Sequence, residues 1–372
     1  MTLKYGLIGA GMMGQEHIRN IALLHDVEVA AICEPNTDMA NAARQLAPNA
    51  QIVPDLPSFF GIEGLDALVI ASPNHMHIGQ LEEIAINCPL PVLAEKPICT
   101  APEDLERVQA LPAKLPHAVW VAMEYRYMPP VAELIKAAEK VTGGVQMLSI
   151  REHRFPFLPK IGDWNRFNDK TGGTMVEKCC HFFDLMRHIL KDDPVRVIAS
   201  AGQHVNHVDE EYDGRKPDIL DHGYVIVDFK RGARAMLELC MFAEGAKYQE
   251  EISVVGPDGK IEALVPGPTR FWNTDAGAPP VPLIVESPRN PTGVLTREVP
   301  VDAALLAAGD HNGSTFYQHR LFADLVRKGQ GVPEVTLTDG AWAVAMGLAA
   351  QIAAQEGRVV EMSEFMGSFS AN

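Results

Sequence analysis

The sequence of 372 residues has little positive charge, no long apolar run and no paired cysteine spacing. Lys and Arg number 32 against 48 Asp and Glu, so the formal net charge is −16. This balance excludes a broadly basic face for nucleic-acid phosphates. No stretch reaches the roughly 18 uninterrupted apolar residues of a membrane span. We therefore expect a soluble, cytoplasmic protein with neither nucleic-acid nor membrane partners.

The six cysteines are scattered and lack a C-x-x-C spacing, which favours reduced thiols over disulfides. Cys179, Cys180 and His181 are consecutive, but adjacent residues of a helix point to different sides and do not converge on a metal. We therefore expect no metal site. The composition, 47% hydrophobic and 22% charged, is that of a globular protein, and the length predicts two domains.

The first third of the chain alternates buried-strand and helix patterns. Apolar runs at 5–8, 27–33, 67–70, 91–94 and 119–123 are separated by stretches with helical periodicity. Strands that alternate with helices predict a doubly wound parallel sheet, an N-terminal Rossmann domain over residues 1–123.

Residues 124–372 follow a different pattern. Helices are expected at 131–140, 175–190, 316–328 and 340–355, and strands at 145–154, 195–201, 224–229, 233–240 and 248–255. Successive strands beside helices predict an α+β domain with an open, mainly antiparallel sheet, used for substrate binding and oligomerisation. Two long segments, 203–222 and 266–300, lack a repeating pattern, which is typical of lids, binding loops or oligomer arms.

A glycine-rich motif, Gly9-Ala10-Gly11-Met12-Met13-Gly14, lies between the first expected strand and the first expected helix. Glycines in this context let a dinucleotide pyrophosphate approach the backbone at a helix N-terminus. Glu34 follows Gly14 by 20 residues, at the end of the second strand. A carboxylate there accepts hydrogen bonds from adenosine ribose hydroxyls and repels a 2′-phosphate. The pattern therefore predicts NAD in preference to NADP.

Two further polar segments follow expected strand ends, where ligands of parallel sheets bind. One is residues 72–77, and the other is Glu95-Lys96-Pro97. Because Lys96 follows a strongly apolar strand, we expect its side chain to emerge into the cleft. A surface ion pair between Glu95 and Lys96 is the alternative.

Glu177, His181 and Asp184 have the i, i+4, i+7 spacing that places side chains on one face of a helix. A neutral histidine accepts a proton from a substrate hydroxyl, and a nearby carboxylate orients it or raises its basicity. The alternative is a structural histidine that a neighbouring carboxylate satisfies.

Together these motifs resemble the Gfo/Idh/MocA family of glucose-fructose oxidoreductase and inositol dehydrogenase along nearly the whole chain. The resemblance also rests on Ser72-Pro73-Asn74-His75, Tyr125-Arg126-Tyr127, Trp164 and Gly172-Gly173. It implies a nicotinamide between a Rossmann domain and an open-faced sheet, and a homo-oligomer, either dimer or tetramer. Lys96 would then hydrogen-bond the reacting hydroxyl, and His181 would take its proton. The expected cofactor-binding residues are Gly9, Gly11, Met12, Met13, Gly14, Glu34, Ser72, Asn74, His77, Glu95, Lys96, Arg126 and Trp164.

Two positions depart from the pattern of the family. Glu177 stands where many members carry Asp, which displaces the carboxylate by about a bond length and leaves its partner open among the substrate, Lys96 and His181. Cys179 and Cys180 stand where many members have a small residue. Both departures indicate a distinct subgroup.

The segment 151–178 is locally basic, with six Lys and Arg against four Asp and Glu. Grouped cations near a cleft bind a carboxylate, sulfonate or phosphate, so an anionic sugar is one hypothesis. The alternative is solvated loop charge balanced by the acidic segment 203–222. The expected contacts of a small carbohydrate substrate are Lys96, Tyr125, Arg151, His153, Arg154, Trp164, Asn165, Arg166, Lys178 and His181.

Three classes of function remain open. The first is a dehydrogenase that oxidises a hydroxyl of a sugar or polyol. The second is an NAD-dependent, redox-neutral glycosidase that acts by C3 oxidation, elimination, hydration and re-reduction, on a sulfonated or acidic glycoside such as a sulfoquinovoside. The third, a non-catalytic dinucleotide sensor, is disfavoured because both Lys96 and His181 are present. We take Lys96, His181 and Glu177 as the candidate catalytic residues.

Overall fold

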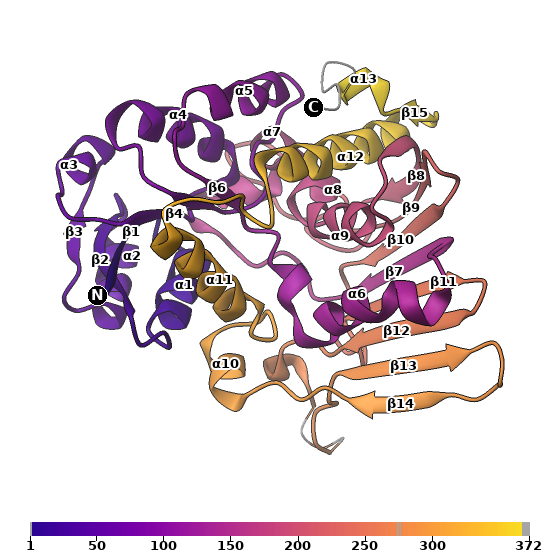
Figure 1. Cartoon of the computed structure of the whole chain (residues 1–372). Coiled ribbons are helices and arrows are strands. Elements are labelled where there is room, and N and C mark those ends of the chain that lie inside the picture. The colour runs from indigo at the N-terminus through magenta and orange to yellow at the C-terminus, as the bar shows by residue number, and fades with distance from the viewer. Residues whose placement is uncertain (1, 274, 276, 367–372) are drawn as a thin grey trace.

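The computed structural model describes residues 2–273, 275 and 277–366. A parallel sheet of six strands forms the N-terminal part, in the order β3-β2-β1-β4-β5-β6 (Figure 1). This confirms the predicted Rossmann-type sheet. Its strands are β1 (Leu3–Ile8), β2 (Val27–Cys33), β3 (Gln51–Val53), β4 (Ala67–Ile70), β5 (Val92–Ala94) and β6 (Val119–Val121).

Helices cover this parallel sheet, and its central strands are buried on both faces. All four residues of β4 are 0% exposed, which explains its uninterrupted apolar sequence. The sequence did not indicate β3, because this strand has three residues that are at most half-buried. The helices are α1 (Met12–Ile21), α2 (Thr37–Leu46), α3 (Leu56–Phe60), α4 (His77–Asn87) and α5 (Asp104–Ala110), with short 3₁₀ turns η1 (Asn74–Met76) and η2 (Leu111–Ala113).

The second sheet has nine strands in the order β14-β13-β12-β11-β7-β10-β9-β8-β15. It is antiparallel except for the pair β7 and β10, which confirms the expected open, mainly antiparallel sheet. Its strands are β7 (Met147–His153), β8 (Pro194–Gly202), β9 (His222–Phe229), β10 (Arg234–Cys240), β11 (Glu250–Gly256), β12 (Gly259–Val265), β13 (Leu283–Pro288), β14 (Leu295–Glu298) and β15 (Val360–Glu361).

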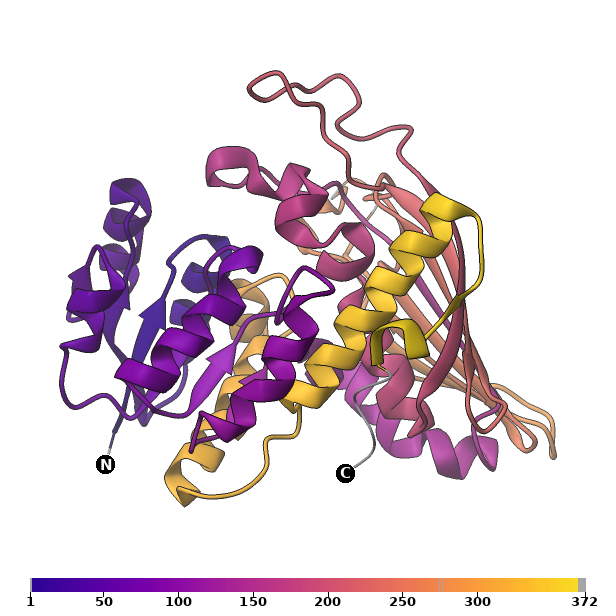
Figure 2. The same ribbon diagram turned by 90° about the horizontal axis from the view of Figure 1, so that it is seen from above.

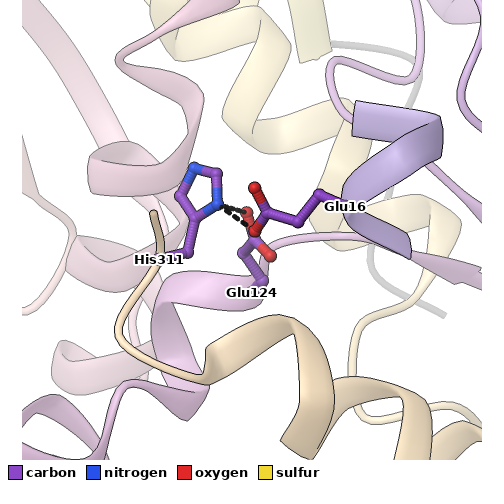
Figure 3. A group of neighbouring side chains, drawn as sticks. All are labelled: Glu16, Glu124 and His311. Atoms are coloured by element: carbon purple, nitrogen blue, oxygen red, sulfur yellow. Dashed lines mark hydrogen bonds and ion pairs between the residues drawn. The ribbon is translucent and has the colours of Figure 1, made fainter. Parts of the chain in front are cut away.

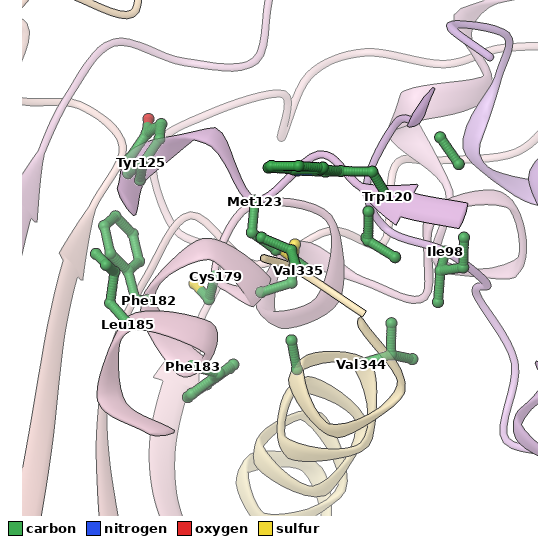
Figure 4. Close-up of a cluster of buried hydrophobic side chains, with 14 of the residues drawn as sticks. Ile98, Trp120, Met123, Tyr125, Cys179, Phe182, Phe183, Leu185, Val335 and Val344 are labelled. Atoms are coloured by element: carbon green, nitrogen blue, oxygen red, sulfur yellow. The ribbon is translucent and has the colours of Figure 1, made fainter. Parts of the chain in front are cut away.

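One face of the second sheet is covered by helices, and the other faces outward (Figure 2). The covering helices are α6 (Pro129–Thr142), α9 (Cys180–Leu190) and α12 (Leu337–Glu356). Between the two sheets, aromatic and aliphatic side chains of β6, the turn η3 (Glu124–Tyr127), α9 and α12 form a continuous core (Figure 4). The core therefore joins both halves of the molecule.

The structure corrects two expectations about regular elements. The segment 266–300 is not irregular throughout, because it contains β13 and β14. Proline and glycine around these edge strands, and the full exposure of β14, hide the usual alternation. The helix expected over 175–190 is two helices, α8 (Thr174–Glu177) and α9, which are separated at Lys178 and Cys179. The segment 203–222 does form a long loop, which projects beyond β8 and β9 (Figure 2).

The last quarter of the chain returns to the first sheet. Helix α11 (Ser314–Lys328) packs on α1, and α12 contacts α5 and β6 as well as α8, α9 and β8. Short elements complete the chain: η4 (Ile161–Arg166), α7 (Asn168–Thr171), η5 (Thr269–Phe271), α10 (Ala303–Ala308) and α13 (Ser363–Met366). Within the described ranges, no helix is long and apolar enough to cross a membrane.

Candidate active site

A cavity of about 650 Å³ lies at the carboxyl edge of the parallel sheet. Most of the expected cofactor residues line it: Gly9, Gly11, Met12, Met13, Glu34, Ser72, Asn74, His77, Glu95, Lys96 and Trp164. Lys160 and Glu177, which follow the last strand of the parallel sheet in the chain, also line it. The cavity therefore brings the glycine motif and the Glu95-Lys96-Pro97 segment to one site.

The glycine motif forms a backbone cradle at the start of α1. Gly9 has a φ of +92°, and a Cβ there would lie 2.7 Å from the Ser72 nitrogen. A Cβ on Gly14 would lie 2.3 Å from the Gly9 oxygen. Gly11 precedes α1, has open space around its Cα and is not capped by a side chain. The uncapped amides and the open space fit a diphosphate, which is the group that NAD would place there.

The carboxylate of Glu34 is held at the cavity wall by two backbone amides. Ala10 N donates to Oε2 at 2.7 Å, and Asn36 N donates to Oε1 at 2.8 Å. These bonds fix the carboxylate next to the glycine motif, and its other lone pairs stay available to ribose hydroxyls. The residues present thus fit the adenosine half of NAD.

The loops after β4 and β5 are tied together by His77, which is fully buried. Its Nδ1 lies 2.8 Å from the Pro97 oxygen and its Nε2 lies 2.9 Å from the Ser72 oxygen. The Ser72 hydroxyl donates to Gln80 Oε1 at 2.6 Å. His77 therefore positions the segment that contains Lys96 as well as lining the cavity.

Lys96 extends from the end of β5 to the second half of the molecule. Its Nζ donates to the backbone oxygen of Glu177 at 3.0 Å, across the junction of the two sheets. In the part of the chain that the structure describes, its ammonium forms no ion pair. The surface ion pair with Glu95 is thus wrong, since Glu95 is 3% exposed and accepts from the Lys96 backbone N–H.

Glu177 ends α8 and is buried beside several cations. Burial raises the pKa of its carboxyl, although the charges of Lys96 and Lys160 oppose the shift. Its Oε2 has no hydrogen-bond partner among the described residues. Glu177 is therefore a buried acid that lines the cavity with one oxygen free for a ligand.

His181 lies in the first turn of α9, and its ring stacks on Tyr125. The ring centroids are 4.1 Å apart and the planes differ by 7°. Burial, and then the charges of Lys96 and Lys178, lower the pKa of His181 well below 6.5. Its Nδ1 is buried and has no partner in the described chain. The neutral imidazole is thus able to accept a proton.

Lys178 belongs to a buried polar cluster on the inner face of the second sheet. Its Nζ donates to the Tyr125 hydroxyl at 2.5 Å and lies 2.8 Å from Glu152 Oε1. Glu250 lies in the same cluster, and burial with the nearby charge of Glu152 raises its pKa to about 7. The ammonium of Lys178 is therefore satisfied internally and holds Tyr125 against His181.

Several expected ligand-binding residues lie elsewhere. Arg126 does not line the cavity: its Nε and Nη2 donate to Asp184 at 2.6 and 2.5 Å, which joins η3 to α9. Arg151 and His153 alternate with the buried Glu152 and so point to the outer face of β7, where they pair with Glu251 and Glu238. Strand alternation thus separates them from the inner face.

Two expected substrate residues of η4 are engaged within the protein. Arg166 Nε donates to Glu210 Oε2 at 2.9 Å, so its charge anchors the long loop 203–222. Asn165 is 0% exposed and its Nδ2 donates to the Leu158 oxygen at 3.0 Å. Both side chains therefore shape the loop before α7.

A second cluster, which the sequence did not predict as a site, consists of Glu16, Glu124 and His311 (Figure 3). His311 Nδ1 lies 2.6 Å from Glu16 Oε1 and 3.6 Å from Glu124 Oε1, and the Thr315 hydroxyl donates to Glu124 Oε2 at 2.6 Å. One ligand-type atom from each of the three lies within 4.8 Å of the others, a grouping that could hold a metal ion. The two carboxylates and the hydrogen bond to Glu16 raise the pKa of His311 to about 9, against its burial.

Comparison with known proteins agrees with this architecture. The model described as "Oxidoreductase family, NAD-binding Rossmann fold" matches residues 3–123, and "Oxidoreductase family, C-terminal alpha/beta domain" matches residues 136–362. Inositol 2-dehydrogenase of Paracoccus denitrificans is 30% identical over 262 residues, 70% of this chain and 73% of the relative. Myo-inositol 2-dehydrogenase of Thermotoga maritima is 24% identical over 380 residues, 98% and 100% of the two chains.

Solved structures share the fold. A levoglucosan dehydrogenase in complex with NADH and levoglucosan superposes with a TM-score of 0.80 at 19% identity, covering 97% of this chain and 100% of the other. An oxidoreductase from Agrobacterium radiobacter, in complex with NAD⁺, L-tartaric acid and magnesium, gives 0.78 at 18% identity, covering 98% and 99%. With both family models matched in order, and with a fitting cavity, the chain belongs to the Gfo/Idh/MocA family of oxidoreductases and uses NAD.

Proposed function

We propose that this protein oxidises a hydroxyl group of a sugar, polyol or sugar derivative, with or without an anionic substituent. The observation that carries the proposal is the ammonium of Lys96 at the cofactor cavity, which has no ion pair among the described residues and donates to the Glu177 oxygen at the end of α8. Its charge acts on the neutral His181 of α9. The relatives named inositol 2-dehydrogenase support a polyol or sugar as substrate.

Each residue has a distinct role in this proposal. When bound, NAD supplies the hydride acceptor. Lys96 donates a hydrogen bond to the reacting oxygen and stabilises the negative charge that develops there. His181 accepts the hydroxyl proton at a ring nitrogen, because its lowered pKa keeps the ring neutral. Tyr125 orients the imidazole by stacking on it.

The test is product analysis of the purified protein with NAD and a panel of sugars and polyols that begins with myo-inositol. Stoichiometric NADH and a keto product, identified by mass spectrometry, are expected. Tight NAD binding with no turnover of any neutral or anionic member of the panel would contradict the proposal.

A redox-neutral glycosidase is the second candidate, and the burial of Glu177 favours it. Elimination and hydration need an acid or base in addition to Lys96 and His181, and Glu177, a cavity-lining carboxyl whose pKa burial raises, is a candidate for that group. The same experiment separates the two functions when glycosides are included. Release of the aglycone without net NADH identifies the glycosidase.

We also propose a homo-oligomer built on the outer face of the second sheet. Ile198, Tyr224 and Ile226 lie there and are 39, 56 and 43% exposed, and Ile198 pairs with Ile226 across neighbouring strands. A second copy of the chain would cover these apolar side chains. Light scattering should give the mass of a dimer or tetramer, and Ile226→Glu should shift it towards the monomer.

A further inference from the structure

The cations around Glu177 and the neighbouring Lys178 differ in whether an acid of the protein pairs with them. Lys178 is paired with Glu152, and Arg166 is paired with Glu210. Lys160 lines the cavity with Lys96, and neither side chain has an ion pair within residues 2–273, 275 and 277–366. The cavity thus keeps cationic groups that the protein leaves without a counter-charge.

Lys160 is held over an aromatic ring, close to the candidate catalytic residues. Its Nζ lies 6.0 Å from the centroid of Trp164. Burial is the largest cause that lowers the pKa of Lys160, and the charges of Glu177, Lys96 and Arg154 also act on it. A ligand that supplies negative charge would stabilise this half-buried ammonium.

Arg154 approaches the same region from the inner face of the second sheet. Its guanidinium carbon lies 4.3 Å from the centroid of Phe155. Its Nε forms a loose ion pair with Glu152 Oε1 at 3.7 Å, which is beyond hydrogen-bonding distance. Lys178 engages Glu152 more closely, at 2.8 Å. Among the described residues, the Arg154 side chain thus has no hydrogen-bond acceptor, and its buried Nε is unpartnered.

One acid, Glu177, lies beside these cations. Burial raises the pKa of its carboxyl, against the charges of Lys96, Lys160, Arg154 and Arg166. Two lysines of the cavity lining, Lys96 and Lys160, thus have no ion pair among the described residues, in a chain with a formal net charge of −16. Such a lining selects anions from a mixture with neutral sugars.

We propose that Arg154 and Lys160 form a subsite for an anionic group of the substrate: a carboxylate, a sulfonate or a phosphate. This inference rests on the proposed oxidation of a sugar or polyol hydroxyl at Lys96. Arg154 presents a planar set of N–H donors from the sheet side, and Lys160 adds a point charge from the cofactor side. A sugar bound between them places its anionic group against this pair and its hydroxyls towards Lys96.

The pyrophosphate of NAD is the competing source of negative charge for Lys160. The pyrophosphate would lie at the glycine cradle at the start of α1. The charge of Lys160 instead interacts with that of Glu177, at the end of α8. Arg154 does not line the cofactor cavity. Loss of NAD affinity in Lys160→Met, with anion binding retained, would assign Lys160 to the cofactor and overturn the two-residue subsite.

The first experiment uses inorganic phosphate and sulfate as probes of the NADH complex, measured by calorimetry, so it does not depend on knowing the sugar. We expect binding by the wild type and a loss of about tenfold or more in affinity in Arg154→Gln and in Lys160→Met. Arg154→Lys should retain more of the anion affinity than Arg154→Gln. Arg151→Gln is the matched control, because Arg151 lies on the outer face of the same strand. Absence of anion binding in the wild type would overturn the proposal.

The second experiment compares turnover of matched pairs, such as glucose with glucuronate and galactose with galacturonate. We expect kcat/KM to favour the anionic member, and Arg154→Gln to reduce that preference about tenfold or more through KM. Turnover of neutral members without an anionic preference would overturn the subsite and leave the oxidoreductase proposal standing. Anion binding without turnover of any sugar would instead contradict the proposed oxidation alone.

Discussion

His17 Nε2 lies 2.9 Å from Glu95 Oε1, so a residue of the first helix holds the acid that precedes Lys96. On the other side of its ring, His17 Nδ1 lies 2.8 Å from His319 Nε2. Burial lowers the pKa of His319 well below its usual range. A neutral His319 that donates from Nε2 to His17, which in turn donates to Glu95, gives each of the two contacts one donor and one acceptor.

The first prediction concerns His17 as a positioning residue. His17→Ala should lower kcat about tenfold and change KM little, because Glu95 loses its donor and Lys96 moves. His17→Gln should recover much of kcat, since an amide donates to Glu95 from a similar place. His25→Ala, at an exposed turn, is the control. Steady-state kinetics decide, and equal losses in the Gln and Ala variants would refute the positioning role.

The second prediction concerns Lys96. Lys96→Met removes the charge beside the reacting oxygen but leaves the glycine cradle and Glu34 in place. NAD affinity, measured by calorimetry, should change less than about threefold, whereas kcat should fall by about 10³ or more. Turnover close to that of the wild type would remove Lys96 from the mechanism.

The third prediction is the pH dependence of oxidation. Because the pKa of His181 lies well below 6.5, the ring is already neutral at pH 6.5 and able to accept a proton. The acidic limb of kcat/KM should therefore lie below pH 6.5, and the rate should not rise further above this pH on account of His181. A profile that still climbs with unit slope between pH 6.5 and 8 would show that another group is the base.

The fourth prediction links His311 to stability. Its pKa is raised from 6.5 to about 9 in the folded protein, so the imidazolium stabilises the fold fully below pH 6.5. This contribution, on the order of 3 kcal/mol, should disappear as the pH rises through 9. Urea unfolding of the wild type and of His311→Gln at several pH values measures it. In the variant, the free energy of unfolding should no longer fall between pH 6.5 and 9. An unchanged pH dependence of this free energy would mean that His311 is not the titrating group.

The cofactor half of the site was predictable because its residues follow strand ends. In a parallel sheet these ends share one edge, so Gly9, Ser72 and Lys96 must meet once the strands are identified. The same reasoning identified Glu34. Local sequence and elementary sheet geometry are sufficient for these contacts.

The substrate half depends on information that is not local. Arg151 and Arg154 have the same side chain and lie three residues apart, yet only Arg154 is on the inner face. That choice is set by the burial of Glu152, which is paired with Lys178 from a distant segment. Arg126 has the charge to bind a phosphate, but its guanidinium forms an ion pair with Asp184, which lies 58 residues further along the sequence. Such pairings depend on the three-dimensional packing.

His17 and Glu16 did carry a signal in the sequence. Two ionisable residues directly after the glycine motif stand on a helix that packs against a sheet, where apolar side chains are usual. Buried polar residues need partners, and these partners, His319 and His311, come from the last quarter of the chain. The sequence therefore indicates that partners exist and leaves their identity open.

Helix α12 packs on β6 and α5 of the first sheet and on α8, α9 and β8 of the second. A Cβ on its Gly347 would lie 2.5 Å from the Met175 oxygen, so helix and backbone are in direct contact there. A hinge motion between the two sheets would have to separate this interface. We therefore expect substrate to enter and product to leave by rearrangement of the loops near 159–164 and 203–222, while Lys96 and His181 keep a constant separation through the catalytic cycle.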